Sequence, residues 1–378
     1  MSGRGDVSTA MRTEVWFAPG RANLMGEHTD YNEGFVLPFA LAQGVAATAT
    51  ARDDGLLVLR SRQKPAEPVT LSLGSLAPRS VTGWAAYPAG AAWALRAAGF
   101  DVLGASIDID SDLPVGAGVS SSAALECSVA LALCSLSGLP VPREQLAKIA
   151  KRAENEFVGA PTGIIDQSAA LLCQADHAML LDCRTRSTTQ VPFRPSAIGA
   201  SALIVDTQVT HALVSGEYAA RRAECEEAAR LLGVPALGRL ADPGAAEVLA
   251  DPVLRRRARH VITDSLRARA MATALQDAIG PEIYPLIGEL LTEGHASLRD
   301  DFEVSWPQAD VAVDAAIAAG AYGAKMIGGG FGGSVLALVP AEFAPSVRTA
   351  LAGAFAERDW TPPEFLEAIP AAAARRLG

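Results

Sequence analysis

Six polar side chains crowd into the stretch GRANLMGEHTDYNEGFVLP, which follows an apolar run at residues 15–18. Burying charge is costly unless the charge is paired or used. The stretch therefore predicts a binding or catalytic site rather than packing. The six side chains are Arg21, Asn23, Glu27, His28, Asp30 and Asn32.

A glycine- and serine-rich loop, LPVGAGVSSS, stands before a long run of small and apolar residues. The N-terminus of a helix attracts phosphate through its free N–H groups and partial positive charge. Gly116 and Gly118 would let the backbone approach an anion closely, and Ser120, Ser121 and Ser122 offer hydroxyl groups to phosphate or Mg²⁺. The loop lacks the G-K-[ST] of a Walker A motif and the distant acid of a Rossmann fingerprint. An N-cap serine on a core helix is the structural alternative.

Two further segments carry candidate chemistry. Asp166, in GIIDQSAALL, is either the N-cap of an apolar helix or a buried functional carboxylate. Glu154 lies on a preceding charged segment, where a solvated helix face is the alternative. The late motif MIGGGFGGSVLALV holds more glycines than one hairpin turn needs, which predicts a loop that abuts a ligand or the phosphate loop. These glycines are Gly328, Gly329, Gly330, Gly332 and Gly333.

Strands and helices must position these groups, and their periodicity predicts a mixed α and β chain. Strands are expected at residues 15–18, within 35–50, and at 55–62, 69–73, 105–114, 177–183 and 201–207. Helices are expected at residues 83–98, 119–136, 143–157, 164–173, 216–232 and 310–319, with others before Arg299. Residues 233–258 are expected to form loop or short helix.

The chain has 378 residues, half of them hydrophobic, which exceeds one ordinary core and predicts two domains. A composition shift near RTRSTTQVPFRPSAIG divides them into residues 1–192 and 193–378. The net charge of −10 argues against a nucleic-acid-binding protein, which needs basic surfaces. The five cysteines form no C-x-x-C pair, so neither a zinc site nor a disulfide framework is expected.

The N-terminal segment lacks the apolar core of a signal peptide, and no apolar run reaches membrane-spanning length. We therefore expect a soluble cytoplasmic protein that binds no membrane, and a monomer.

The order of these motifs resembles the GHMP family of small-molecule kinases. The stretch GRANLMGEHTDYNEGFVLP is similar, nearly residue for residue, to the galactokinase signature, and SGEYAARRAECEEA resembles the second half of galactokinases. The resemblance covers residues 15 to about 339. It implies an α+β, two-domain GHMP kinase fold of mixed sheets and helices, with the active site in the cleft between the domains. The implied activity is transfer of phosphate from ATP to galactose, giving α-D-galactose 1-phosphate.

By this resemblance, Asp166 is the catalytic base at the anomeric hydroxyl, and Arg21 holds it and stabilises charge on the phosphoryl group. Such chemistry fits phosphoryl transfer, which depends on positioning and electrostatic stabilisation. The sugar-binding residues implied are Glu27, His28, Asp30, Gly163 and Tyr218. Carboxylates suit this task because each accepts hydrogen bonds from hydroxyl groups. A metal site at Glu27, His28 and Asp30 is a competing interpretation, and a structural role is an alternative for His28.

The resemblance also assigns the ATP site. The phosphate loop is implied to comprise Gly116, Ala117, Gly118, Val119, Ser120, Ser121 and Ser122. Trp84 and Tyr87 match aromatic residues near the adenine, with packing in the helix core as the alternative for Tyr87. Ser122 and Glu154 match the ligands of Mg²⁺, which accompanies ATP and prefers oxygen. If the match to the family is shifted by one residue, Ser121 rather than Ser122 is the expected Mg²⁺ ligand.

Several residues depart from the family pattern: Met25, Val119, Lys325, Ile327 and Ser334. None belongs to the expected catalytic pair. One or two pocket residues can change the preferred sugar, so a kinase for arabinose, galacturonate or N-acetylgalactosamine is the first alternative. A sugar-sensing regulator without turnover is the second. The intact catalytic pair, serine loop and Glu154 argue against it.

Overall fold

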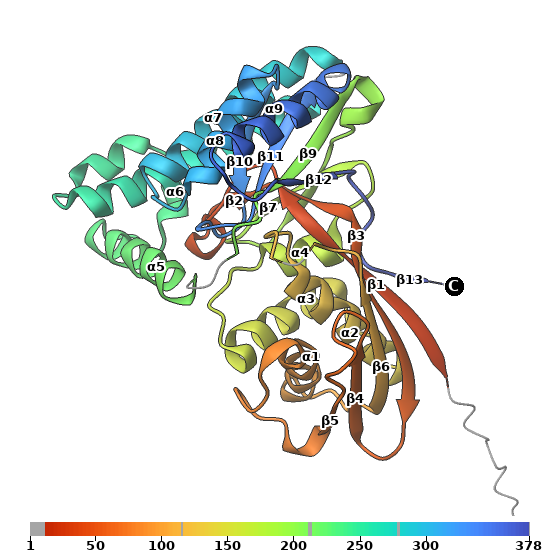
Figure 1. The fold of residues 1–378 in the computed structure, drawn as a ribbon. Helices are drawn as coiled ribbons and strands as arrows, with labels where there is room; N and C mark the ends of the chain where they lie inside the picture. Colours follow the sequence, from red (N-terminus) through yellow and green to blue (C-terminus); the bar gives the residue numbers. More distant parts are fainter. Residues whose placement is uncertain (1–11, 115, 211–213, 278–279, 378) are drawn as a thin grey trace, which may run out of the picture.

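A computed structural model describes residues 12–114, 116–210, 214–277 and 280–377 and shows two bodies joined by long strands (Figure 1). The first body is built on a six-stranded sheet in the order β13-β1-β3-β6-β4-β5. Neighbouring strands run antiparallel, except that β4 and β6 are parallel. The strands are β1 (Thr13–Asn23), β3 (Pro38–Arg52), β4 (Leu56–Ser61), β5 (Val69–Ser72), β6 (Gly104–Ser111) and β13 (Arg375–Leu377).

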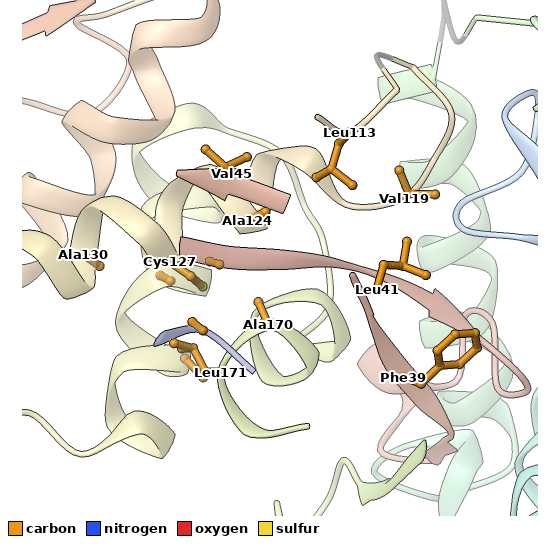
Figure 2. Packing of buried hydrophobic residues seen from close by; sticks show 14 of the residues in the cluster. Phe39, Leu41, Val45, Leu113, Val119, Ala124, Cys127, Ala130, Ala170 and Leu171 are labelled. Carbon is orange, nitrogen blue, oxygen red and sulfur yellow. The ribbon is translucent and has the colours of Figure 1, made fainter. Parts of the chain in front are cut away.

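Four helices pack on this sheet or on each other: α1 (Ala86–Ala97), α2 (Ser121–Leu136), α3 (Arg143–Arg152) and α4 (Ile165–Leu172). The helix α2 is rich in alanine and carries little charge, so it packs closely against β1 and β3. Figure 2 shows Ala124 and Cys127 of α2 and Ala170 of α4 near Leu41 and Val45 of β3. Small side chains here bring the helix N-termini close to the strands that carry the polar signature.

The second body holds a four-stranded sheet in the order β10-β11-β9-β12. Its strands are β9 (Ala200–Asp206), β10 (Gly323–Ile327), β11 (Ser334–Pro340) and β12 (Glu364–Glu367). The helices of this body are α5 (Val214–Leu231), α6 (Pro252–Asp277), α7 (Tyr284–Asp300), α8 (Pro307–Ala318) and α9 (Ala344–Ala356). A second buried apolar cluster lies among these elements, while the core of the first body also takes in side chains of β9, β11, α6 and α7. A third sheet, β2 (Phe35–Val36), β7 (His177–Asp182) and β8 (Thr188–Pro192), completes the fold.

The α+β architecture in two bodies agrees with the prediction, while the boundary at residues 192/193 stays a prediction. The far end of the chain returns to the first body, where β13 pairs with β1 and Ala371 bridges to Ala40. Among the described residues, no helix combines the length and apolarity that crossing a bilayer requires.

Several element boundaries differ from the sequence prediction. The strand expected at residues 15–18 continues through Pro19 and Gly20 to Asn23, because a register shift between Pro19 and Arg21 absorbs the irregularity. The helix expected from Val119 begins at Ser121, because Ser120 has a left-handed backbone with φ of 62°.

The helix expected at 143–157 is α3 followed by a π-helical turn, Ala153–Val158. Residues 233–251 contain two 3₁₀ turns, Leu237–Arg239 and Pro243–Val248, in agreement with the prediction of loop or short helix. The prediction is wrong for residues 252–258, which begin the long helix α6.

Candidate active site

A cavity of about 490 Å³ lies where loops of the two bodies meet. It is lined from the first body by the polar signature, the glycine-serine loop and residues 160–166, and from the second by Tyr218, Gly328 and Gly329. The cleft between the bodies is therefore where the predicted site residues come together. Those that line it are Arg21, Glu27, His28, Asp30, Tyr87, Gly116, Gly118, Val119, Ser120, Ser121, Ser122, Gly163, Asp166 and Tyr218.

Arg21 connects the phosphate loop to Asp166. The irregularity in β1 brings its backbone N–H to 3.1 Å from the Val119 carbonyl. Its side chain donates to Asp166 Oδ1 at 2.8 Å and to the Gly118 carbonyl at 2.6 Å. The close approach requires glycine at position 20, where a Cβ would lie 2.7 Å from the Val119 carbonyl oxygen.

Asp166 lies in the first turn of α4, but it does not cap that helix. The N-cap position is Ile164, which has no side-chain capping bond. The alternative of a structural N-cap is therefore wrong for Asp166. Its side chain is 19% exposed and faces the cavity.

The glycine-serine loop uses backbone conformations that favour glycine. Gly116, Gly118 and Ser120 have positive φ angles of 84°, 71° and 62°. Ser120 occupies the N-cap position of α2 without making a side-chain capping bond, so capping does not explain this serine. Its backbone and those of the glycines open the loop toward the cavity.

The late glycine loop abuts the phosphate loop, as predicted. A Cβ at Gly328 would lie 3.2 Å from the Gly118 carbonyl oxygen. Ser334 donates to the Ala117 carbonyl at 2.7 Å, which ties β11 to the same loop. Ala117 itself is fully buried and does not line the cavity.

Asp30 and Gly163 form one structural unit. The Asp30 carboxylate accepts from the backbone N–H groups of Tyr31 at 2.9 Å and Ile165 at 3.4 Å. A Cβ at Gly163 would lie 1.5 Å from Asp30 Oδ2, so only glycine leaves room for this carboxylate. Burial raises the pKa of Asp30, and the nearby charge of Asp166 adds to this.

His28 is a buried, uncharged member of the cluster. Burial lowers its pKa to about 3, with a further contribution from His260. Its ring nitrogens lie 2.9 Å from the Tyr31 hydroxyl and 3.2 Å from the Gly329 carbonyl. The ring packs against Tyr218 with 5.1 Å between centroids. His28 therefore joins the polar signature to α5 and to the late glycine loop of the second body.

Glu27 is buried, and one of its carboxylate oxygens, Oε2, pairs with the Lys325 ammonium. Burial raises the pKa of Glu27, while the charge of Lys325 acts in the opposite direction. The sequence analysis noted Lys325 only as a departure from a pattern. No local motif signals that pair, because it joins β10 to the N-terminal signature.

Glu154 lies just behind the cavity wall on the π-helical turn, a feature often found at functional sites. Its Oε1 accepts from Ser122 at 3.0 Å, and its Oε2 accepts from Thr162 and Gln167, both at 2.7 Å. Burial raises the pKa of Glu154, and the Asp166 charge adds to this. The solvated-face alternative is therefore wrong for Glu154.

The donors around Glu154 fit a hard divalent cation. The Ser122 hydroxyl and the Glu154 carboxylate are oxygen ligands, and the acids Glu126 and Asp166 lie near Glu154. Burial and the Glu154 charge also raise the pKa of Glu126. A cation here would favour the charged forms of Glu126 and Glu154. Within the described ranges, no group of three or more His, Cys, Asp or Glu residues could hold a metal ion by itself.

The two expected adenine residues differ in position. Tyr87 lines the cavity at the end near Ser122 and Glu154, and Glu154 contributes to raising its pKa to about 12, after burial. Trp84 does not line the cavity and packs against the core of the first body. Both assignments to the nucleotide stay predictions.

Sequence reasoning missed several polar residues that support the predicted ones. His260, Asp264 and Lys325 come from α6 and β10, distant in sequence from the signature, so only the fold brings them to it. Glu126, Thr162 and Gln167 lie around Glu154, and Thr162 and Gln167 belong to the same segment of the sequence as Asp166.

Comparison with known proteins matches three family models to this chain. The galactokinase galactose-binding signature covers residues 8–51, the GHMP kinase N-terminal domain covers 86–174, and the GHMP kinase C-terminal domain covers 281–357. The first two contain most of the residues that line the cavity.

Curated relatives and a solved structure agree with these matches. A galactokinase of Streptomyces coelicolor is 50% identical over 96% of this chain and 94% of its own. A galactokinase of Mycobacterium tuberculosis is 45% identical over 89% of this chain and 91% of its own. The crystal structure of Lactococcus lactis galactokinase complexed with galactose superimposes with a TM-score of 0.91 at 31% identity, covering 99% of this chain and 97% of that one. The chain belongs to the galactokinase family of GHMP kinases.

Proposed function

We propose that this protein transfers the γ-phosphoryl group of ATP to the anomeric hydroxyl of D-galactose, giving α-D-galactose 1-phosphate and ADP. The observation that carries the proposal is the Arg21–Asp166 pair, which lies on the cavity between the glycine-serine loop and the polar signature. The galactokinases that resemble the chain over most of its length support the same activity.

Asp166 is proposed to act as the base. Arg21 occupies Asp166 Oδ1, which leaves Oδ2 to accept the proton of the anomeric hydroxyl as its oxygen bonds to phosphorus. The same guanidinium binds the Gly118 carbonyl and is thereby fixed beside the phosphate loop, where it can stabilise charge on the transferred group. A group of this kind contributes about 10²–10⁴-fold to the rate.

The polar signature is proposed to bind the sugar. Asp30 and Glu27 offer buried carboxylate oxygens to hydroxyl groups, and we assign Asp30 to the C4 side of galactose and Glu27 to the C6 end. Tyr218 closes the cavity from the second body. His28, being uncharged, acts as a hydrogen-bonding and packing group rather than as a cation.

The glycine-serine loop, residues 116–122, is proposed to bind the ATP phosphates, with Tyr87 near the nucleotide. Mg²⁺ bound with ATP neutralises phosphate charge. Ser122 and Glu154 would hold it, with phosphate oxygens and water completing the shell. Thr162 and Gln167 fix the Glu154 carboxylate in position for that task. We assign the two domains to residues 1–192 and 193–378, with the last strand crossing back.

A coupled assay of ATP consumption with a panel of sugars tests the proposal. We expect rapid, Mg²⁺-dependent turnover with galactose, and glucose turnover lower by several orders of magnitude. A site that hydrogen-bonds a hydroxyl rejects an analogue by up to about 10⁴–10⁵-fold. Faster turnover with arabinose, galacturonate or N-acetylgalactosamine would instead assign a related sugar kinase. Galactose binding without turnover would indicate a regulator.

A further inference from the structure

Lys325 on β10 is a buried lysine that the proposed mechanism does not use. It is completely buried, and it does not line the cavity. Its ammonium pairs with Glu27 Oε2 and lies 3.5 Å from the Asn23 carbonyl oxygen. The pair joins a strand of the second body to the sugar-binding signature of the first. A lysine in such a place requires an anionic partner, because an unpaired buried charge is strongly destabilising.

Glu27 is the carboxylate that pairs with Lys325, because the other buried acid nearby has partners of its own. Asp264 of α6 is also fully buried, but it accepts from the Gly26 backbone N–H at 3.0 Å and from Arg267 at 3.3 Å. Asp264 therefore has its own cation. Each of the two buried acids thus has one cation: Glu27, which faces the cavity, pairs with Lys325, and Asp264 pairs with Arg267.

The second oxygen of Glu27 remains available. Glu27 Oε1 is buried and has no hydrogen-bond partner in the part of the chain that the structure describes. Glu27 also lines the cavity. A carboxylate whose Oε2 is fixed by an ion pair cannot rotate freely, so Oε1 has one direction in which to accept a hydrogen bond. An unsatisfied buried acceptor is costly, and a sugar hydroxyl would satisfy it.

We propose that Lys325 is a positioning residue for sugar selectivity: by holding Glu27 Oε2, it sets Oε1 to accept a hydrogen bond from the 6-hydroxyl of galactose. The inference rests on the proposed function, because it deepens the assignment of Glu27 to the C6 end. Lys325 acts through Glu27 and does not touch the sugar.

The test compares galactose with 6-deoxygalactose, which lacks only the hydroxyl in question. For Lys325→Met, kcat/KM for galactose should fall about 10- to 100-fold, the loss of one hydrogen bond to a charged group, mainly through KM. For 6-deoxygalactose the change should stay within about threefold, since the lost bond was never made. Lys325→Arg keeps the charge and should preserve the ratio of the two sugars within about threefold. A merely structural role would lower both sugars alike.

A second arm keeps the test valid if Lys325→Met fails to fold with Glu27 buried and unpaired. Glu27→Leu, which offers Lys325 no acceptor, is compared with the double variant Glu27→Leu/Lys325→Met, in which both positions are apolar. We expect the ratio of kcat/KM for the two sugars to be the same in these two proteins, because Lys325 then has nothing to position.

Two results would overturn the inference. One is an equal loss on both sugars in Lys325→Met, and the other is a further change of the ratio when Lys325→Met is added to Glu27→Leu. A parent enzyme that phosphorylates neither sugar would overturn the proposed function instead, so the two failures are distinguishable.

Discussion

One carboxylate oxygen of Asp166 accepts a hydrogen bond from Arg21, and the residue lines the cavity. Asp166 is therefore the residue whose substitution tests the proposed mechanism most directly. Asp166→Asn should lower kcat by about 10²–10⁴-fold, because the amide cannot accept the proton of the sugar hydroxyl. Galactose binding and melting temperature should change little, since the amide oxygen can still accept from Arg21. Steady-state kinetics, calorimetric titration with galactose and thermal unfolding measure these quantities.

Asp101→Asn provides the matched control, because Asp101 is an exposed aspartate away from the site. It should behave as the parent in all three measurements. Near-normal kcat in folded Asp166→Asn would remove Asp166 from the mechanism.

Gly163 tests how tightly the sugar site is packed. In Gly163→Ala the new methyl group would meet Asp30 Oδ2 at 1.5 Å, so the carboxylate must move. We expect KM for galactose to rise at least about 10-fold, because a displaced carboxylate loses its bond to the sugar, and stability to fall by about 1–3 kcal/mol from overpacking.

Gly353→Ala is the control for that substitution, since a Cβ at Gly353 meets no atom within 4 Å. It lies within α9 and should be neutral or slightly stabilising. Unchanged galactose kinetics in Gly163→Ala would show that Asp30 does not bind the sugar.

At the scale of elements, the π-helical turn at Ala153–Val158 places Glu154 behind the phosphate loop and Glu156 in solvent. Glu154→Gln should raise the Mg²⁺ concentration for half-maximal activity by about 10-fold or more, because an amide is a poorer ligand for a hard cation than a carboxylate. KM for galactose should hardly change. Mg²⁺ titrations at fixed ATP measure the effect.

Glu156→Gln makes the same chemical change two residues further along the same turn, at a side chain that faces water, and it should match the parent. Superimposable Mg²⁺ titrations for Glu154→Gln and Glu156→Gln would exclude Glu154 as a metal ligand, and Ser121 and Ser122 would then be compared.

The helix α6 carries a second buried histidine that makes stability depend on pH. His260 lies between the Ser297 hydroxyl at 3.0 Å and the Glu27 carbonyl at 3.1 Å, and burial lowers its pKa to about 3. The unfolded chain binds a proton on His260 below about pH 6.5, and the folded chain does not. The contribution of His260 is therefore complete above that pH and is lost as pH falls, by about 1.4 kcal/mol per pH unit.

His260→Gln should remove this dependence. The slope of the unfolding free energy against pH, measured with urea between about pH 7 and about pH 5, should be smaller than the parent's by about 1 kcal/mol per pH unit, because His260 of the unfolded chain is only partly protonated near pH 6.5. Taking the difference between the two proteins is necessary, because His28 acts in the same direction and buried carboxylates with raised pKa, such as Asp30, act in the opposite one. Equal slopes would show that His260 is protonated in the folded state.

At the scale of the whole molecule, the cavity is shared between the two bodies, so a bound sugar should stabilise them together. Galactose at about 100 times its Kd should add about 2.7 kcal/mol to the free energy of unfolding. Glucose at the same concentration should add little, because its C4 hydroxyl cannot meet Asp30 in the same way. Thermal unfolding with each sugar measures this, and equal shifts would contradict the assignment to galactose.

The sequence predicts those parts of the site whose residues are adjacent in the chain. The signature around Arg21 and Asp30 and the loop Gly116–Ser122 are local, so their residue types and order suffice to indicate a kinase. The two-domain α+β fold follows from the same resemblance and from length.

The supporting residues could not be predicted, because their role depends on contacts across the fold. Lys325 reaches Glu27, and Gln167 reaches Glu154, only after strands and helices have packed. The role of Gly163 depends on the position of the Asp30 carboxylate, which no spacing rule encodes. The end of β1 was misplaced because Pro19-Gly20 marks an irregularity within the strand rather than its end.

The pairing of β13 with β1 has a consequence for synthesis on the ribosome. The long strand β1 emerges early, yet the residues that cover its outer edge lie near the other end of the sequence. Until residues 375–377 are made, residues 15–17 of that edge present unpaired N–H and C=O groups, the kind of template on which nascent chains aggregate. The helices of the first body can thus pack during translation, but its sheet is complete only after the second body has been synthesised. Chaperones that shield exposed strand edges should therefore increase the yield of this folded protein, even though the first body is synthesised first.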